Sequence, residues 1–259
     1  MTKNSIRLSA RLMAVAGFIE DGADVADIGT DHGYLPVYLA QSGLAGRIFA
    51  SDISADSLRS ALRSAEKYGV ADKISFVVAP GLAGIGETEV DTIVISGLGG
   101  ETISQILARE SQSKIDSVRL ILQPQTKTGR LCSWLSDNGY SILDAKLARD
   151  DGRLYVIILA GNGAVCLRGE RTEESGESAV GILSCADPVS SILNSSEPDK
   201  ELLHILAGKC DPLFAEYIDV LISSARRAAE GMARSGEAGY PLMMKRLEVL
   251  GALDKLQCT

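Results

Sequence analysis

The chain has 259 residues, a formal net charge of −8 and 46% hydrophobic residues. This length and apolar content predict one large domain with room for a small appendage, and they exclude wholesale disorder. The acidic balance argues mildly against a nucleic-acid partner, because phosphate contacts dominate such binding, but a local basic face can do that work on an acidic protein.

Targeting and metal-binding patterns are weak in this sequence. We expect no membrane span, because no apolar run reaches about 18 residues without a charge, and the N-terminus does not have the long apolar segment of a secretory signal. The five cysteines are scattered, odd in number and without a CxxC pair. No metal site or disulfide framework is therefore expected, and a reducing, cytoplasmic location fits best.

The first predicted element is an amphipathic helix over residues 6–20. Apolar side chains recur there at helical spacing, at Ile6, Leu8, Leu12, Val15, Ala16 and Ile19. Arg7 and Arg11 stand four residues apart, so in a helix they would share one face, close to Lys3. Two interpretations remain open for this basic cluster: a phosphate-binding surface, or an ordinary solvated helix face.

Short apolar runs then alternate with helical stretches. The strand candidates are 24–28, 47–52, 73–79, 90–96 and 118–122, and the helices between them are 34–43, 55–69, 100–110 and 127–138. This alternation predicts an α/β fold with a mostly parallel sheet that is covered on both faces. Two more strands, 141–148 and 153–160, flank an Asp-Gly turn signal, so we expect them to pair antiparallel.

The character of the chain changes near Gly161. We expect three parts: a cofactor-binding domain over residues 1–160, a connecting segment rich in Gly, Ser and Glu over 161–198, and a helical part over 199–259. Helices are predicted at 199–235, with a possible break at Asp211-Pro212, and at 241–257. Their leucine stripes can face each other, which favours an antiparallel helical hairpin.

The most informative segment is Val25-Ala-Asp-Ile-Gly-Thr-Asp-His-Gly-Tyr34, which predicts a strand, a tight glycine turn and a helix start. A second acid, Asp52, ends the next apolar run 25 residues after Asp27. An acid in that place commonly binds a pair of ribose hydroxyls. Two further turns, Ser96–Gly100 and Gln123–Gln125, follow later strands and should lie at the same edge. Their convergence favours a nucleoside-type cofactor.

The charge at Asp31 bears on which cofactor this is. A dinucleotide turn brings its central backbone against pyrophosphate, and Asp31 would place a negative charge there. S-adenosylmethionine carries no phosphate but has a sulfonium and an ammonium group, so a nearby carboxylate is compatible with it. This favours methyl transfer over hydride transfer, and an NAD-dependent dehydrogenase would rest on the fold alone.

Several segments together resemble the bacterial TrmK family of tRNA adenine-N1 methyltransferases. They are Leu8-Ser-Ala-Arg-Leu12, Asp27-Ile-Gly-Thr-Asp-His-Gly-Tyr-Leu-Pro36, Asp52-Ile53, Ser96-Gly-Leu-Gly-Gly-Glu101, Leu122-Gln-Pro124 and Asp151-Gly-Arg-Leu-Tyr155. The resemblance spans residues 1 to about 160, and the tail matches more loosely through Pro212-Leu-Phe-Ala-Glu-Tyr217. It implies a Rossmann-like class I methyltransferase with a seven-stranded sheet and a C-terminal hairpin. It also implies S-adenosylmethionine as donor and N1 of adenine 22 in tRNA as acceptor.

The resemblance also implies roles for individual residues. Gly29 and Thr30 would line the methionine portion of the donor, Asp52 would bind its ribose, and Ile53 would pack on its adenine. The full expected cofactor set is Asp27, Gly29, Thr30, Asp31, His32, Gly33, Asp52, Ile53, Gly81, Leu82, Gly97, Leu98 and Gly99. The expected tRNA-binding set is Arg7, Arg11, Tyr34, Gly100, Gln123 and Pro124, and arginines 226, 227 and 234 of the tail could extend it.

Asp31 is the expected catalytic residue, as the acceptor of a hydrogen bond from adenine N6. The alternative is that Asp31 only caps the following helix or binds the ammonium group of the donor. Tyr34 is a candidate for stacking on a flipped base and Gln123 for bonding a base edge, although Tyr34 could simply pack on the sheet.

One segment departs from the family pattern. Where the family has Gly-Asp-Gly-Leu after the third strand, this chain has Ala79-Pro-Gly-Leu82. Pro80 offers neither a carboxylate nor an N–H group, so recognition of the cofactor adenine must rest on backbone groups near Gly81 and Leu82. Two alternatives stay open: a methyltransferase for a small molecule or protein, which the acidic net charge and modest basic clusters favour, and a non-catalytic module that binds S-adenosylmethionine, which Pro80 suggests.

Overall fold

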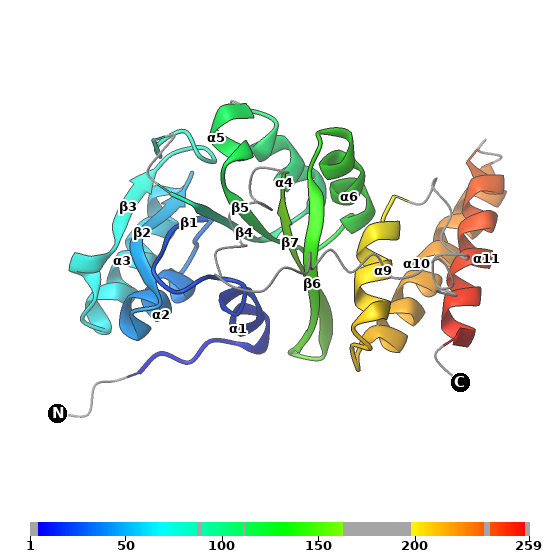
Figure 1. The fold of residues 1–259 in the computed structure, drawn as a ribbon, viewed down its shortest axis with the longest axis horizontal. Helices are drawn as coiled ribbons and strands as arrows, with labels where there is room; N and C mark the ends of the chain where they lie inside the picture. Colours follow the sequence, from blue (N-terminus) through cyan, green and yellow to red (C-terminus); the bar gives the residue numbers. More distant parts are fainter. Residues whose placement is uncertain (1–4, 87–89, 111, 163–197, 236–238, 257–259) are drawn as a thin grey trace, which may run out of the picture. The chain divides into compact units, whose positions relative to one another are not determined.

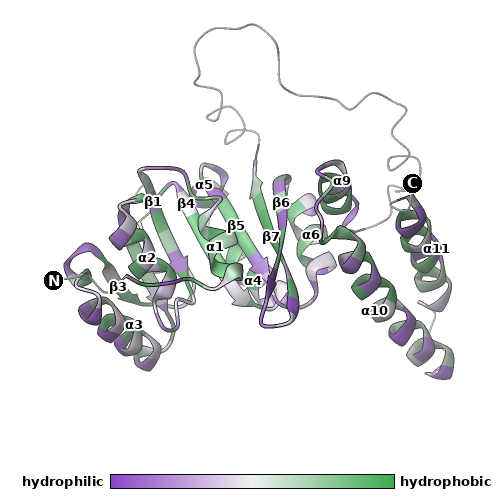
Figure 2. Ribbon diagram, turned by 90° about the horizontal axis from the view of Figure 1, so that it is seen from below, coloured by the Kyte–Doolittle hydropathy of each residue, from purple (hydrophilic) through white to green (hydrophobic). Residues whose placement is uncertain are grey.

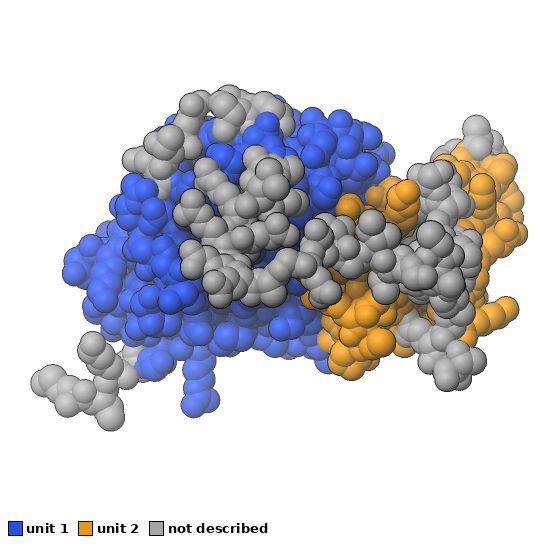
Figure 3. Space-filling model, in the orientation of Figure 1, with its two compact units in different colours: residues 1–171 blue, residues 172–259 orange. Residues whose placement is uncertain are grey.

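The computed structural model describes residues 5–86, 90–110, 112–162, 198–235 and 239–256. The chain divides into two compact units, residues 1–171 and 172–259 (Figure 3). Most of the predicted connecting segment, 161–198, lies outside the described residues. In the described part of the chain, no helix is both long and apolar enough to cross a membrane.

The first unit is built on a seven-stranded sheet in the order β3-β2-β1-β4-β5-β7-β6 (Figure 1). Its strands are β1 (Ala23–Ile28), β2 (Ala45–Asp52), β3 (Ser75–Val78), β4 (Thr92–Leu98), β5 (Arg119–Pro124), β6 (Ser141–Asp150) and β7 (Arg153–Gly161). The first five strands are parallel, whereas β7 pairs antiparallel with both β5 and β6. The predicted fold class is confirmed, and the strand order reverses between β1 and β4.

Four helices connect the parallel strands close to where they were predicted. They are α2 (Tyr34–Ser42), α3 (Ala55–Lys67), α4 (Gly100–Leu107) and α6 (Thr128–Asp137). A short helix, α5 (Gln112–Asp116), and a 3₁₀ turn at Ala71–Lys73 were not predicted. Neither is long enough to show a hydrophobic period, and the turn also delays the start of β3 beyond the predicted residue 73.

The N-terminal helix is shorter than predicted. Helix α1 runs over Ala10–Ala16, with the Ser9 hydroxyl accepting the Leu12 N–H at 3.4 Å and Gly17 ending it. The segment before it is held otherwise, because the Ile6 N–H donates to the Gln41 side chain at 2.9 Å. Arg7 therefore precedes the helix, and the prediction that Arg7 and Arg11 share one helical face is wrong.

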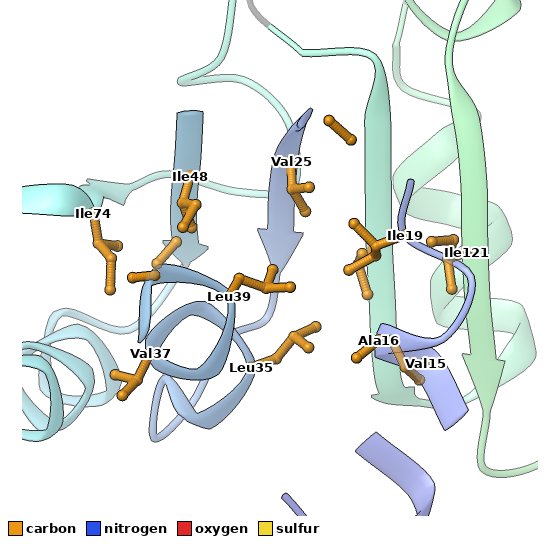
Figure 4. Packing of buried hydrophobic residues seen from close by; sticks show 14 of the residues in the cluster. Val15, Ala16, Ile19, Val25, Leu35, Val37, Leu39, Ile48, Ile74 and Ile121 are labelled. Atoms are coloured by element: carbon orange, nitrogen blue, oxygen red, sulfur yellow. The ribbon is translucent and has the colours of Figure 1, made fainter. Parts of the chain in front are cut away.

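Apolar side chains fill both faces of the sheet. On one face, Val15 of α1 and Leu35 and Leu39 of α2 pack in one cluster with Val25 and Ile48 of the sheet (Figure 4). Helices α4 and α6 contact the sheet on the other face, and the ribbons of β5 and β7 are largely hydrophobic in Figure 2. The central strands are buried over continuous apolar runs, Ile93–Ile95 and Leu120–Leu122, as parallel strands covered on both faces require.

The second unit is helical. It contains α9 (Lys200–Gly208), α10 (Phe214–Ser235) and α11 (Tyr240–Leu256), and α10 packs against α11 as the predicted hairpin. The break at Asp211-Pro212 is also confirmed, with the Asp211 carboxylate accepting the Leu213 N–H at 2.9 Å. Arg246 of α11 donates to both carboxylate oxygens of the buried Asp199, at 3.0 and 2.7 Å, which ties α11 to the start of α9.

Candidate active site

A cavity of about 620 Å³ opens at the C-terminal ends of β1, β2 and β4. It lies where the strand order reverses, which is the place where open α/β sheets bind their ligands. Residues from all four predicted segments line it, including Gly29, Asp52, Gly97 and Gln125. Its volume suits a nucleoside-sized ligand.

The cavity brings together most, but not all, of the predicted site residues. The predicted cofactor residues that line it are Asp27, Gly29, Thr30, Asp31, His32, Asp52, Ile53, Gly81, Gly97 and Leu98, together with Arg11 and Tyr34 from the expected tRNA-binding set. The predicted residues outside its lining are Gly33, Leu82, Gly99, Arg7, Gly100, Gln123 and Pro124. Gly33 has a packing reason to be glycine, since a Cβ there would stand 2.7 Å from the Ala61 Cβ.

Backbone hydrogen bonds join the turn after β1 to the end of β2. The N–H groups of Gly29 and Thr30 donate to the Ser51 carbonyl at 2.8 and 3.1 Å. The Asp52 carboxylate accepts the Asp31 N–H at 3.4 Å and the Ser54 N–H at 2.8 Å. These contacts fix the carboxylate of Asp52 at the edge of the cavity.

Asp27 is a buried acid beside this turn. Burial raises its pKa to about 6, the neighbouring Asp52 charge acts in the same direction, and Thr30 and Arg11 oppose them. The Thr30 hydroxyl lies near enough to favour the ionised form of Asp27. It is nevertheless buried without a hydrogen bond of regular geometry to any of the described residues. A ligand with a cationic group that donates hydrogen bonds would satisfy both groups.

A second network lies on the β4 and β5 side of the cavity. Arg11 donates from Nη1 to the Gln123 Oε1 at 2.6 Å, and its guanidinium lies over the Tyr155 ring, 5.6 Å from the centroid. The same Oε1 accepts the Gly97 N–H at 3.1 Å, and the Gln123 Nε2 donates to the Pro124 carbonyl at 3.1 Å.

This network changes how Gln123 is interpreted. Gln123 is fully buried, and both ends of its amide are bonded within the protein. We interpret it as the residue that joins Arg11 to the Gly97 turn. Gln125 is better placed to meet a base edge, because it lines the cavity.

The rim beside β1 carries exposed polar and aromatic side chains. Asp31 takes a left-handed backbone conformation (φ 47°), and its side chain is 68% exposed. His32 lies with Nε2 3.5 Å from an Asp31 carboxylate oxygen and with Nδ1 3.0 Å from the Ser60 hydroxyl. Tyr34 is 47% exposed, and its ring stacks on His32 with the ring centroids 5.5 Å apart, so packing on the sheet does not account for it.

Comparisons with known proteins agree with this geometry. Residues 8–158 match the family model for a methyltransferase domain. The tRNA (adenine(22)-N(1))-methyltransferase of Bacillus subtilis is 37% identical over 160 residues, which are 62% of this chain and 67% of that protein. The chain belongs to the TrmK family.

Solved structures of TrmK proteins match almost the whole chain. The B. subtilis TrmK structure superposes with a TM-score of 0.75 at 26% identity, covering 96% of this chain and 100% of that one. A Streptococcus pneumoniae protein described as a putative tRNA (m1A22) methyltransferase, solved with S-adenosylmethionine, gives a TM-score of 0.72 at 26% identity and the same coverages. The match therefore includes the helical unit, where the sequence resemblance is loose.

Sequence reasoning within the TrmK pattern missed one wall of the cavity. Thr102, Ile106 and Arg109 line it from α4 and the residues just after α4. Their spacing of four and three residues places them on one helical face, which was a usable signal. Pro80, which departs from the family pattern, also lines the cavity, so the substitution affects the site directly.

Proposed function

We propose that this protein methylates N1 of adenine 22 in tRNA and uses S-adenosylmethionine as the methyl donor. Membership of the TrmK family supports this proposal. The observation that carries it is the pair Asp27 and Asp52 at the cavity edge: Asp27 is buried beside the Thr30 hydroxyl, and Asp52 is fixed by two backbone N–H groups. This pair fits a ligand that has a cationic amino acid portion and a ribose.

The residues that would hold the donor follow from their chemistry. The Asp52 carboxylate can accept both ribose hydroxyls, and Asp27 with Thr30 can bind the ammonium group. Ile53 is 75% exposed at the cavity edge and offers an apolar surface for the adenine ring. When bound, S-adenosylmethionine supplies an electrophilic methyl group on its sulfonium.

Asp31 is proposed to stabilise charge on the acceptor. As N1 of adenine takes up a methyl group, positive charge spreads over the ring and is relieved by loss of an N6 proton. The exposed carboxylate of Asp31 can accept a hydrogen bond from N6 and favour that change, while Tyr34 stacks on the base. His32 lies close enough to Asp31 to orient its carboxylate.

The role of Asp31 can be tested by two substitutions. Asp31→Asn and Asp31→Ala should each lower kcat by about 100-fold, as loss of a charge-stabilising group commonly does, with S-adenosylmethionine affinity almost unchanged. Single-turnover methylation and calorimetric titration of the same preparations measure the two effects. Wild-type rates in variants that bind the donor normally would reject the catalytic role.

Exposed basic residues are proposed to bind tRNA phosphates. Arg7 is exposed ahead of α1, and Arg226, Arg227 and Arg234 are exposed on α10. Lys3 lies outside the described residues. We propose accordingly that residues 1–160 bind the donor and that the helical part over 199–259 contributes tRNA contacts, which should be sensitive to salt.

The function is tested with two tRNA transcripts that differ only in nucleotide 22. Labelled S-adenosylmethionine should yield N1-methyladenosine in the transcript with adenine at this position and none in the transcript with guanine. Donor binding without turnover on either transcript or on total tRNA would instead indicate a binding module. Transfer to protein or small molecules alone would identify a different methyltransferase.

A further inference from the structure

A buried lysine lies behind the cavity. The side chain of Lys114, in α5, is only 9% exposed, and its ammonium is 3.0 Å from the carboxylate of Glu110, which is itself 12% exposed. Lysine is almost never so buried unless it is paired, because removing a charge from water is costly. An apolar side chain could fill the volume of the Lys114 side chain without this cost, so the buried charge indicates a specific role.

Lys114 binds the loop that follows β3. Its Nζ donates to the Leu82 carbonyl at 2.6 Å, and the same carbonyl accepts the Ile85 N–H at 3.0 Å. One residue earlier, the Gly81 carbonyl accepts the Ser51 hydroxyl at 3.3 Å. Two successive peptide planes are therefore held, one from the end of β2 and the other from α5.

Close packing restricts which residue and which backbone conformation can occur at Gly81. Its φ is +62°, and a Cβ there would stand 3.1 Å from Ile106 of α4. Pro80 and Gly81 both line the cavity. Contacts from β2, α4 and α5 thus hold the loop beside the cavity.

The loop offers one hydrogen-bond donor at the cavity, the N–H group of Gly81. Among the described residues, neither the Gly81 N–H nor the Leu82 N–H has a protein acceptor. Pro80 contributes no N–H and no carboxylate, and Leu82 lies outside the cavity lining, so the Gly81 N–H is what residues 80–82 can present to a base. An N–H group pairs with a ring nitrogen that accepts a hydrogen bond, such as N1 of adenine.

We infer that Lys114 is a positioning residue for recognition of the donor adenine. By holding the Leu82 carbonyl, while Ser51 holds the Gly81 carbonyl, it keeps Gly81 beside the cavity so that the Gly81 N–H can face N1 of that base. This inference rests on the proposed function, since it takes the ligand to be S-adenosylmethionine. It also explains how the site reads adenine without the acid that Pro80 replaces.

The test compares two demethylated ligands that differ only at the base edge. S-adenosylhomocysteine has an acceptor at N1, whereas S-inosylhomocysteine carries a hydrogen there. The wild-type protein should prefer the adenine ligand by about 30-fold. With the inosine ligand, the loop N–H would face the hydrogen on N1 and would have no acceptor. Lys114→Met should reduce this preference to about threefold. Lys73→Met, which changes an exposed lysine just ahead of β3, should leave it unchanged.

Calorimetric titrations of both ligands give the ratio, and thermal unfolding reports stability separately. A merely structural lysine would lower Tm and leave the ratio unchanged, which would overturn the inference, as would equal affinity of the wild type for both ligands. If Lys114→Met does not fold, Glu110→Gln is titrated in its place. This substitution leaves Lys114 without its charged partner and should lower the ratio of the two ligand affinities by a smaller factor. A wild type that binds neither ligand would instead refute the proposed function.

Discussion

The two sides of the cavity are built in different ways. The donor rim, defined as Asp27–Gly33 with Asp52, comes from one βαβ unit and is joined by backbone hydrogen bonds to Ser51 and by a bond to Asp52 from a residue 21 positions away. The transfer rim, defined as Arg11, Gly97 and Gln123, is joined by a hydrogen bond between residues 112 positions apart. The donor rim therefore shows in a local motif, whereas the transfer rim exists only once α1, β4 and β5 have packed together.

The largest effect should come from removing the acid of the donor rim. Asp52→Ala deletes the proposed ribose acceptor and releases the Asp31 and Ser54 N–H groups, so affinity for S-adenosylmethionine should fall by about 100-fold. Asp56→Ala, four residues on and exposed, is the matched control and should bind normally. Calorimetry measures both, and equal affinities would show that the donor lies elsewhere.

Breaking the transfer rim should affect turnover more than donor binding. Arg11→Ala removes the bond to Gln123 and loosens the Gly97 turn, so kcat should fall by about 30-fold with little change in donor affinity. Arg11→Lys should not restore kcat. A lysine ammonium lacks the planar guanidinium that both lies over the Tyr155 ring and donates to Gln123.

Arg7→Ala provides the contrast to Arg11→Ala. Arg7 is exposed and outside the cavity lining, so its loss should weaken tRNA binding in a salt-dependent way and leave kcat unchanged. Filter-binding at several salt concentrations separates the two variants. If Arg11→Ala regains the wild-type kcat at saturating tRNA, Arg11 binds phosphate and does not support turnover through the Gly97 turn.

The raised pKa of Asp27 predicts two pH effects. Because its folded pKa of about 6 exceeds the unfolded value of 3.8, burial opposes folding as the pH rises from about 4 to 6, and the cost is complete above 6. Asp27→Asn should therefore stabilise the ligand-free protein at pH 7.5 by at most about 3 kcal/mol, and by almost nothing at pH 4.

The same acid should make donor binding depend on pH. S-adenosylmethionine is cationic and favours ionised Asp27, so wild-type affinity should rise about tenfold between pH 5 and 7 and then level off. Asp27→Asn should flatten that rise. Denaturant unfolding and calorimetry at each pH measure the two effects, and a wild-type affinity that does not vary over this range would contradict the assignment.

A change in stability tests the packing behind the transfer rim. A Cβ at Gly100 would stand 2.5 Å from the Lys127 carbonyl, so Gly100→Ala should destabilise the protein by about 1–3 kcal/mol. Gly231, inside α10, has open space around it, and Gly231→Ala should stabilise by about 0.5–1 kcal/mol. Denaturant midpoints measure both variants, and a neutral Gly100→Ala would show that this turn can move.

Local patterns predicted the sheet, the β6–β7 hairpin and the convergence of turns, because strand periodicity and turn chemistry depend on neighbouring residues. They failed where distant contacts decide the outcome. Ile6 and Leu8 fit a helical period, yet Ser9 caps α1, which begins at Ala10, and the Ile6 N–H donates to Gln41 instead. Likewise, no pattern around Gln123 distinguishes an amide that reads a base from one that holds Arg11.

The sequence by itself determined that a glycine turn and two acids would meet at the C-terminal edge of a parallel sheet, because strand direction and alternation place them there. Only the tertiary structure decided that burial would raise the pKa of Asp27, that Gln123 would face inward, and that Lys114 would support the loop after β3. These properties depend on solvent exclusion and on partners supplied by distant segments, which short-range spacing does not encode.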